Sequence, residues 1–212
     1  MISIVNYGMG NIRSVQGALD YLGIENRLIS RPEEVLESES LILPGVGSFA
    51  AAMQNIRQLG LFEPLNKMVL ERGVPVLGIC LGMQLLAEIG EEDGPSNGFS
   101  WIRGRVERFR FDDSTLKIPH IGFNTACFVP RSESLFAGLG AQADFYFVHS
   151  YCMICERDQD VTAWVDYGGP FVAAVQRQNV YGTQFHPEKS QSNGLKVLRN
   201  FANARVLAAV GV

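Results

Sequence analysis

The stretch that decides the fold is Val74-Pro75-Val76-Leu77-Gly78-Ile79-Cys80-Leu81-Gly82-Met83, at residues 74–83. Its apolar start has the length of a buried strand, and the apolar spacing that follows predicts a helix over residues 83–89. Two glycines flank Cys80 in a G-x-C-x-G pattern, which is typical of a turn too tight for larger neighbours. The stretch therefore predicts a strand–turn–helix unit that holds a cysteine at its turn.

Upstream of this unit, short apolar strands alternate with segments that have helical periodicity. The predicted strands cover residues 1–7, 24–29 and 41–43. The predicted helices cover residues 12–22, 49–59 and 63–71. Such alternation is typical of α/β proteins, in which helices cover both faces of an open, mostly parallel sheet. We therefore predict an α/β fold.

Downstream, short strands follow one another with few helices between them. The predicted strands cover residues 105–111, 143–148, 161–165, 171–176 and 180–184. Gln178-Asn179 predicts a hairpin turn between the last two, and the apolar spacing over residues 191–206 predicts a helix that closes the chain. This succession predicts an antiparallel extension of the sheet in the C-terminal half. Because we find no repeat or linker, we expect residues 1–212 to form a single domain.

Composition excludes several classes of function. The 212 residues are 47% hydrophobic and 19% charged with a net charge of -4, which is an ordinary globular balance. No basic stripe offers a footprint for nucleic acid. No apolar run reaches the roughly 18 residues of a membrane span. The N-terminal segment lacks the pattern of a signal peptide, so we expect no membrane contact and a cytoplasmic location.

Cys80 is the candidate nucleophile. A helix that begins directly after it would direct its N-terminus at the thiol and favour the thiolate. The N–H of Leu81 would then be placed to donate to an oxyanion. For the pentapeptide alone, a buried cysteine in a glycine-rich turn remains the alternative.

A base for this thiol is available among three histidines: His120, His149 and His186. All three follow strand-like apolar residues, and each is compatible with a buried core histidine. His186 differs because Glu188 stands two residues on, where a carboxylate can orient the imidazole. Glycine-rich backbone at Pro44-Gly45-Val46-Gly47 follows another predicted strand and offers a second oxyanion donor. A cysteine, a histidine and a glutamate in this order favour nucleophilic catalysis.

The other notable cysteine pattern is the C-x-x-C spacing of Cys152 and Cys155. Such a pair is compatible with a redox pair or half of a zinc site. No second pair stands at finger-like spacing, and the flanks are typical of a strand, whereas a redox pair usually opens a helix. We therefore favour a structural role and expect no metal site.

Three segments together resemble the class I glutamine amidotransferases: PGVGSF at 44–49, GICLGMQLL at 78–86 and TQFHPEKS at 183–190. The resemblance runs from end to end and is closest to glutaminase subunits of imidazole glycerol phosphate synthases. Four further segments also match: NYGMGNIRSV at 6–15, IPHIGFN at 118–124, YFVHSY at 146–151 and DYGGPFVAAV at 166–175.

The resemblance implies that glutamine is hydrolysed to glutamate and ammonia without a cofactor. It implies Cys80 as nucleophile, His186 as general acid and base, and Glu188 as its orienting group. The implied oxyanion donors are the backbones of Gly45, Val46, Gly47 and Leu81. The implied substrate-binding residues are Gln84, Glu92, Ser150 and Tyr151. The implied partner interface holds Phe123, Asn124, Tyr146 and Lys189, against a (β/α)₈-barrel cyclase that forms a heterodimer with this chain and receives the ammonia.

Two departures from the family pattern leave the partner open. Phe123 stands where the family usually has tryptophan, and residues 125–128 also differ. The alternative is a paralogous glutaminase that supplies ammonia to a sugar-amidating synthetase of surface-glycan biosynthesis.

Three other classes of function were also weighed against the sequence. A dinucleotide-binding oxidoreductase is suggested by Gly8-Met9-Gly10, but the third glycine of its fingerprint falls on Arg13. A cysteine peptidase or γ-glutamyl hydrolase would share the turn and work without a partner, and a non-catalytic interaction module would leave Cys80 unreactive.

Overall fold

The computed structural model describes residues 1–111, 116–131 and 135–210, with side chains up to residue 204. Its helices are α1 (Ile12–Tyr21), α2 (Pro32–Leu36), α3 (Phe49–Gln58), α4 (Phe62–Asn66), α5 (Leu81–Gln84) and α6 (Gln191–Val210). Its strands are β1 (Ile2–Val5), β2 (Asn26–Ile29), β3 (Leu41–Gly45), β4 (Val76–Cys80), β5 (Ile89–Gly90), β6 (Ser96–Asn97), β7 (Gly104–Arg108), β8 (His120–Phe128), β9 (Gln142–His149), β10 (Tyr151–Cys155), β11 (Val161–Asp166), β12 (Pro170–Arg177) and β13 (Val180–Thr183). None of the helices in the described ranges is both long and apolar enough to span a bilayer.

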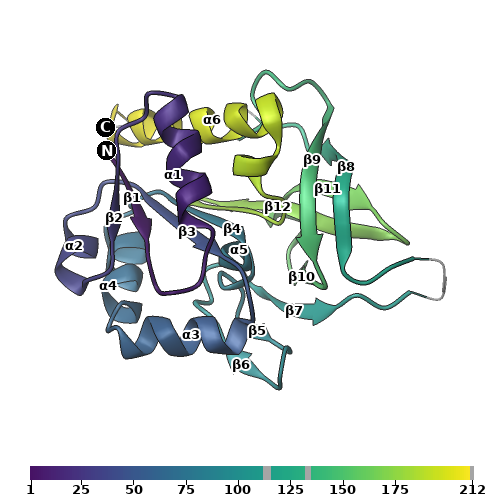
Figure 1. The fold of residues 1–212 in the computed structure, drawn as a ribbon, viewed down its shortest axis with the longest axis horizontal. Coiled ribbons are helices and arrows are strands. Elements are labelled where there is room, and N and C mark those ends of the chain that lie inside the picture. The colour runs from purple at the N-terminus through teal and green to yellow at the C-terminus, as the bar shows by residue number, and fades with distance from the viewer. Residues whose placement is uncertain (112–115, 132–134, 211–212) are drawn as a thin grey trace.

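A large sheet runs through the centre of the molecule in the order β2-β1-β3-β4-β13-β12-β11-β8-β9 (Figure 1). Neighbours from β2 to β13 pair in parallel, and those from β13 to β9 pair antiparallel. The predicted α/β class with an antiparallel extension is therefore confirmed. The hairpin at Gln178-Asn179 is confirmed as well, but β13 itself lies in the parallel half, directly beside β4.

Helices cover both faces of this sheet. Helices α1 and α6 lie on one face, and α2, α3 and α4 lie on the other (Figure 1). Alternate residues of a strand point to opposite faces, and β4 follows this rule. Leu77 and Ile79 pack in the core shared with α1 and α6, whereas Val76 packs in the core shared with α3 and α4. The cysteine that ends β4 is thus held by a strand that is buried on both faces.

The predicted helix over residues 83–89 is wrong. Helix α5 ends after one turn, and residues 89–90 form β5 instead. The carbonyls of Leu85, Leu86 and Ala87 accept hydrogen bonds from the backbone N–H groups of Phe99, Ile102 and Ser100. Because these tertiary bonds take the acceptors that a longer helix needs, the helix stops.

A second, smaller sheet has the order β10-β7-β5-β6. It packs with α3 and α4 through Val106 of β7 and Met153 of β10. The sequence analysis predicted β7 but neither this separate sheet nor strands β8 and β10. Strands β5 and β6 are two residues long and pair with each other, and β5 also pairs with β7; segments this short show no apolar periodicity that could predict them.

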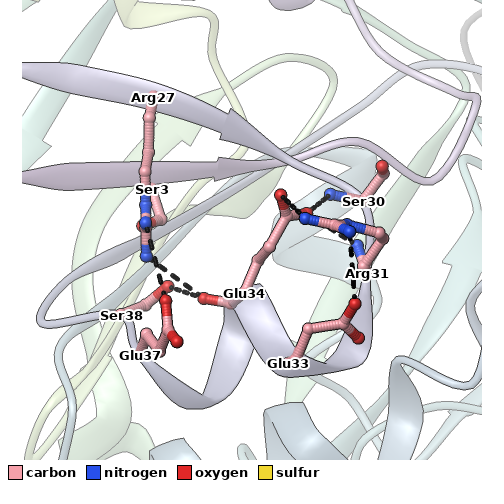
Figure 2. Close-up of polar contacts among 8 residues, drawn as sticks. All are labelled: Ser3, Arg27, Ser30, Arg31, Glu33, Glu34, Glu37 and Ser38. Carbon is pink, nitrogen blue, oxygen red and sulfur yellow. Dashed lines mark hydrogen bonds and ion pairs between the residues drawn. The ribbon is translucent and has the colours of Figure 1, made fainter.

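Helix α2 was also not predicted, and Figure 2 shows the contacts that hold it. Glu34 accepts hydrogen bonds from the N–H groups of Ser30 and Arg31, each at 3.0 Å. The Arg31 guanidinium binds the same carboxylate at 3.0 Å, and these contacts lower the pKa of Glu34 to about 2. At the other end, Ser38 donates to the Glu34 carbonyl. A five-residue helix has little stability of its own, so these contacts decide that it forms.

Candidate active site

The turn after β4 places Cys80 in a conformation that only glycine adopts easily. Its φ is 55° and its ψ is -109°, and such strain at a non-glycine residue is characteristic of functional sites. A Cβ on Gly78 would lie 2.5 Å from the Gly82 carbonyl oxygen, and a Cβ on Gly82 would collide with the Leu43 carbonyl of β3. The two glycines therefore let the turn pack directly on the neighbouring strand, as the G-x-C-x-G pattern predicted.

The short length of α5 changes one expectation about Cys80. A single turn carries a much smaller dipole than the predicted longer helix, so the helix offers little field at the sulfur. What α5 does supply is the first-turn N–H of Leu81, a position without an intrahelical acceptor. This N–H lies at the edge of the cavity described below and remains a candidate oxyanion donor.

His186 and Glu188 form a buried pair just beyond β13. His186 Nδ1 lies 2.8 Å from a Glu188 carboxylate oxygen, and the two side chains are 2% and 1% exposed. Burial alone would lower the pKa of His186, but the neighbouring Cys80 and the hydrogen-bonded carboxylate of Glu188 raise it to about 9. A raised pKa favours the protonated ring, whose charge the Glu188 carboxylate stabilises through Nδ1.

The remaining ring nitrogen of His186 is the one available to Cys80. Nδ1 is occupied by Glu188, and Nε2 is buried without a hydrogen bond to any residue that the structure describes. The sulfur is close enough to contribute to the raised pKa of His186, yet its one donated hydrogen bond goes to the Val148 carbonyl at 3.8 Å. The structure thus brings together the three residues that the sequence proposed.

A cavity of about 250 Å³ opens at the turn. Its walls are Val46, Gly47, Cys80, Leu81, Gln84, Glu92, Val148, His149, Ser150 and Tyr151. All four predicted substrate-binding residues and three of the four predicted oxyanion residues are among them. Gly45, the fourth, pairs with Cys80 in the sheet. His186 and Glu188 are not among the residues that line it.

Two polar side chains of the cavity are already engaged by the protein. Gln84 donates one N–H to the Tyr151 carbonyl at 2.9 Å and the other to Gln184 at 3.1 Å, so its oxygen is the group it can offer to a ligand. Glu92 accepts the N–H of Phe49, the first residue of α3, at 2.9 Å. Burial raises the pKa of Glu92. The cavity therefore brings an acceptor and a carboxylate into the same space as the thiol.

The backbone of Pro44–Gly47 is fixed at its start and free at its end. The buried Tyr7 hydroxyl donates to the Pro44 carbonyl at 2.6 Å, and Gly45 is held in β3. Val46 is 41% exposed, and Gly47 has a φ of 109°, which favours glycine. The segment thus passes from a rigid strand to open backbone beside the cavity.

Three of the predicted interface residues lie on the outer strands β8 and β9 of the large sheet, and the fourth, Lys189, ends the short 3-10 helix Pro187–Lys189. Phe123 is 52% exposed and meets the Tyr146 ring edge-on at 5.7 Å, and Lys189 lies 5.7 Å from the same ring. Asn124 does not join them, because its side chain donates to the Asp166 carbonyl. Phe123, Tyr146 and Lys189 therefore form a surface patch of two rings and a cation.

The C-x-x-C pair consists of two free thiols on β10. Cys152 packs against the core on the α1 and α6 side, and Cys155 against the opposite core. Burial raises the pKa of Cys152 to about 11 and that of Cys155 to about 12. Neither thiol is poised for redox chemistry. The described part of the chain gathers no group of three metal-binding side chains.

Sequence reasoning assigned no role to two residues that contact the site. Gln184 is fully buried and places its amide nitrogen 3.7 Å from the Cys80 sulfur. His149 is buried against His120 at 3.4 Å, and burial lowers the pKa values of these rings to about 3 and 4, so both are neutral. The sequence held no local signal for Gln184, because its contact with Cys80 depends on the pairing of β13 with β4.

Comparisons with known proteins show the family to which this chain belongs. The family model described as glutamine amidotransferase class-I matches residues 3–204. The imidazole glycerol phosphate synthase subunit HisH of Leptospira interrogans is 44% identical over 205 residues, which cover 96% of this chain and all of that protein. The subunit of the same name from Moorella thermoacetica is 47% identical over 200 residues, with 94% and 93% covered.

Solved structures share the fold at low identity. A crystal structure titled glutamine amidotransferase has a TM-score of 0.72 at 22% identity and covers 97% of this chain and 100% of its own. PurLQS from Thermotoga maritima has a TM-score of 0.73 at 20% identity, with 96% and 97% covered. The match over nearly the whole sequence decides the classification: this chain belongs to the class-I glutamine amidotransferase family.

Proposed function

We propose that this chain is the glutamine amidotransferase subunit of an imidazole glycerol phosphate synthase in histidine biosynthesis. The main observation behind this proposal is that Cys80, His186 and Glu188 form a buried group beside a cavity. The chain also has relatives that bear this subunit's name. These relatives favour the histidine pathway over the sugar-amidating alternative. We propose further that residues 1–212 act as one domain in the cytoplasm, where the free thiols remain reduced.

The first half-reaction forms a thioester and releases ammonia. With its pKa raised to about 9, His186 holds the proton of Cys80, and the thiolate attacks the carboxamide carbon of glutamine. As the C–S bond forms, charge moves to the oxygen, where the N–H of Leu81 and a backbone N–H from Gly45–Gly47 stabilise it. The tetrahedral intermediate then loses its C–N bond, and His186 gives its proton to the departing nitrogen.

The second half-reaction restores the thiol. His186, now neutral, takes a proton from water as the oxygen attacks the thioester carbon. Collapse breaks the C–S bond, glutamate leaves, and His186 again shares a proton with the sulfur. Glu188 binds Nδ1 throughout, so all proton exchange uses Nε2. No metal or organic cofactor takes part in either step.

The cavity walls fit the amino-acid end of the substrate. The carboxylate of Glu92 suits an α-ammonium group, and the free oxygen of Gln84 accepts a further hydrogen bond. Ser150 and Tyr151 supply the neighbouring wall. We assign these four residues to binding rather than to chemistry.

The ammonia goes to a partner subunit, which we propose to be a (β/α)₈-barrel cyclase that binds at Phe123, Tyr146 and Lys189. Asn124 follows Phe123 on β8, and its side chain donates to the Asp166 carbonyl instead of joining this patch. The open backbone at Val46 and Gly47 allows the partner to control whether the oxyanion site is complete. Such coupling would limit the loss of glutamine when no acceptor is bound.

The test is glutamate release from glutamine by the purified chain, alone and with a histidine-pathway cyclase and its nucleotide precursor. We expect low glutaminase activity for the chain alone and a large rise with both additions. Cys80→Ala should release no glutamate, whereas Cys127→Ala should keep full activity. Turnover by pure Cys80→Ala would refute the glutaminase. Absence of any rise, with Cys80 still labelled by a glutamine-analogue electrophile, would refute the histidine-pathway partner and favour a sugar-amidating synthetase.

A further inference from the structure

An amide that the mechanism above does not use lies against the nucleophile. Gln184 follows β13 directly, is 0% exposed, and has its nitrogen 3.7 Å from the Cys80 sulfur. Its backbone N–H is tied to the Ala173 carbonyl at 2.8 Å, so the residue is fixed in place. A buried amide is costly unless its polar atoms have partners, and here one partner is the reacting sulfur.

The orientation of this amide follows from a chain of hydrogen bonds that begins at a backbone carbonyl. The Tyr151 carbonyl can only accept, so the Gln84 atom 2.9 Å from it must be the NH₂ group. The same NH₂ lies 3.1 Å from the Gln184 side chain, which must present its oxygen there. The Gln184 NH₂ group therefore points at Cys80.

A hydrogen bond from the neutral His149 supports this assignment of the Gln84 amide orientation. His149 Nδ1 lies 2.8 Å from the same Tyr151 carbonyl and must donate to it. Reversing the Gln84 amide would place its oxygen against a carbonyl that already accepts from His149. The direction of the hydrogen bonds is thus set by backbone and carried through two side chains to the sulfur.

We propose that Gln184 is a catalytic residue that donates an N–H to the Cys80 sulfur and stabilises its negative charge, and that Gln84 orients it. This inference rests on the proposed glutaminase function and adds a residue to it. In the thiol form, the sulfur donates to the Val148 carbonyl at 3.8 Å. That carbonyl opposes a thiolate, whereas the Gln184 N–H favours one in both half-reactions, whenever the sulfur carries charge.

The experiment measures alkylation of Cys80 by iodoacetamide in the full chain without glutamine, followed by mass spectrometry of the Cys80 peptide over a range of pH. Gln184→Met removes the donor at similar volume. Gln184→Glu keeps an acceptor for Gln84 but replaces the donor near the sulfur with an oxygen. Gln176→Met on β12 is the matched control, because Gln176 is not among the residues that line the cavity.

We expect both Gln184 variants to react roughly tenfold to a hundredfold more slowly at about pH 7, the range that a lost hydrogen bond to a charged group implies. Their rates should approach the parent rate above about pH 10, where an ordinary thiol is ionised. The control variant should match the parent. Equal rates at neutral pH for the parent and either folded Gln184 variant would overturn the proposal.

A double variant tests the role of Gln84. Gln84→Met should slow the alkylation, and adding it to Gln184→Met should slow it no further, because Gln84 acts through Gln184. Additive effects would refute this orienting role. Alkylation needs neither substrate turnover nor the partner, so these outcomes are distinguishable from a failure of the proposed function, which glutamate release by Cys80→Ala would reveal.

Discussion

The substitution Gly82→Ala tests whether the turn at Cys80 depends on contact between two backbones. A Cβ at this position would collide with the carbonyl oxygen of Leu43. That carbonyl belongs to β3, which is paired with β1 and β4 and cannot move without breaking sheet hydrogen bonds. The clash must therefore displace α5 and the turn that holds Cys80.

Overpacking of this kind typically costs about 1–3 kcal/mol in the free energy of unfolding. Alanine would return up to about 1 kcal/mol through helix propensity, but α5 is one turn long and gains less. We expect a net loss of about 1–3 kcal/mol, which lowers the melting temperature by roughly 2–4 °C for each kcal/mol in a chain of this size. Displacement of Cys80 should lower glutaminase activity by a factor on the order of a hundred.

Gly17→Ala is the matched control. Gly17 is exposed in α1, and a Cβ there would meet no atom within 4 Å. The same change should raise stability by roughly 0.5–1 kcal/mol and leave activity unchanged. Urea unfolding and glutamate release measured on both variants give the result. Parent-like or greater stability in Gly82→Ala would contradict the close approach of α5 and β3.

Three further predictions concern buried groups. Tyr7→Phe should lower the free energy of unfolding by about 1–3 kcal/mol, measured by urea titration, because the buried Pro44 carbonyl loses the hydroxyl that donates to it. Tyr21→Phe, at an 80% exposed position, should have no effect in the same titration. Folding raises the pKa of His186 from 6.5 to about 9, so the stability that its proton contributes is fully present below about pH 6.5 and is lost as the pH rises through about 9. Unfolding curves across this range should show the loss in the parent and not in His186→Gln; a parallel dependence in both would contradict the raised pKa. Iodoacetamide near neutral pH should label the exposed Cys127 and spare Cys155, whose pKa burial raises to about 12, and rapid labelling of Cys155 in the mass spectrum would show that it is accessible.

The sequence pattern within a segment predicted the secondary structure correctly where contacts of that segment with its near neighbours determine it. The helix periodicity of α1 and α3 and the apolar run of β4 each reflect burial of a face that the sequence displays residue by residue. The same holds for the turn at Cys80, because its two glycines are required by contacts within a few residues and with one neighbouring strand. The α/β class rested on these features and the family resemblance on the motifs at 44–49, 78–86 and 183–190, and both are confirmed.

Local pattern failed where hydrogen bonds from distant segments decide the outcome. Helix α5 ends early because residues 98–102 occupy the carbonyls of residues 85–88. Strand β13 joins the parallel half because β4 offers it a buried edge, although its hairpin with β12 is antiparallel. Both facts depend on pairings between separate segments, which the apolar periodicity of either segment alone does not reveal.

The sequence by itself thus determined the α/β class, the family, and the identity and order of Cys80, His186 and Glu188. Tertiary structure alone decided the electrostatics of the site, because burial and hydrogen bonds across the fold shift each pKa and orient each amide. Gln184 is the clearest case: it lies 104 residues from Cys80 in the chain, and only the pairing of β13 with β4 brings its N–H to the sulfur.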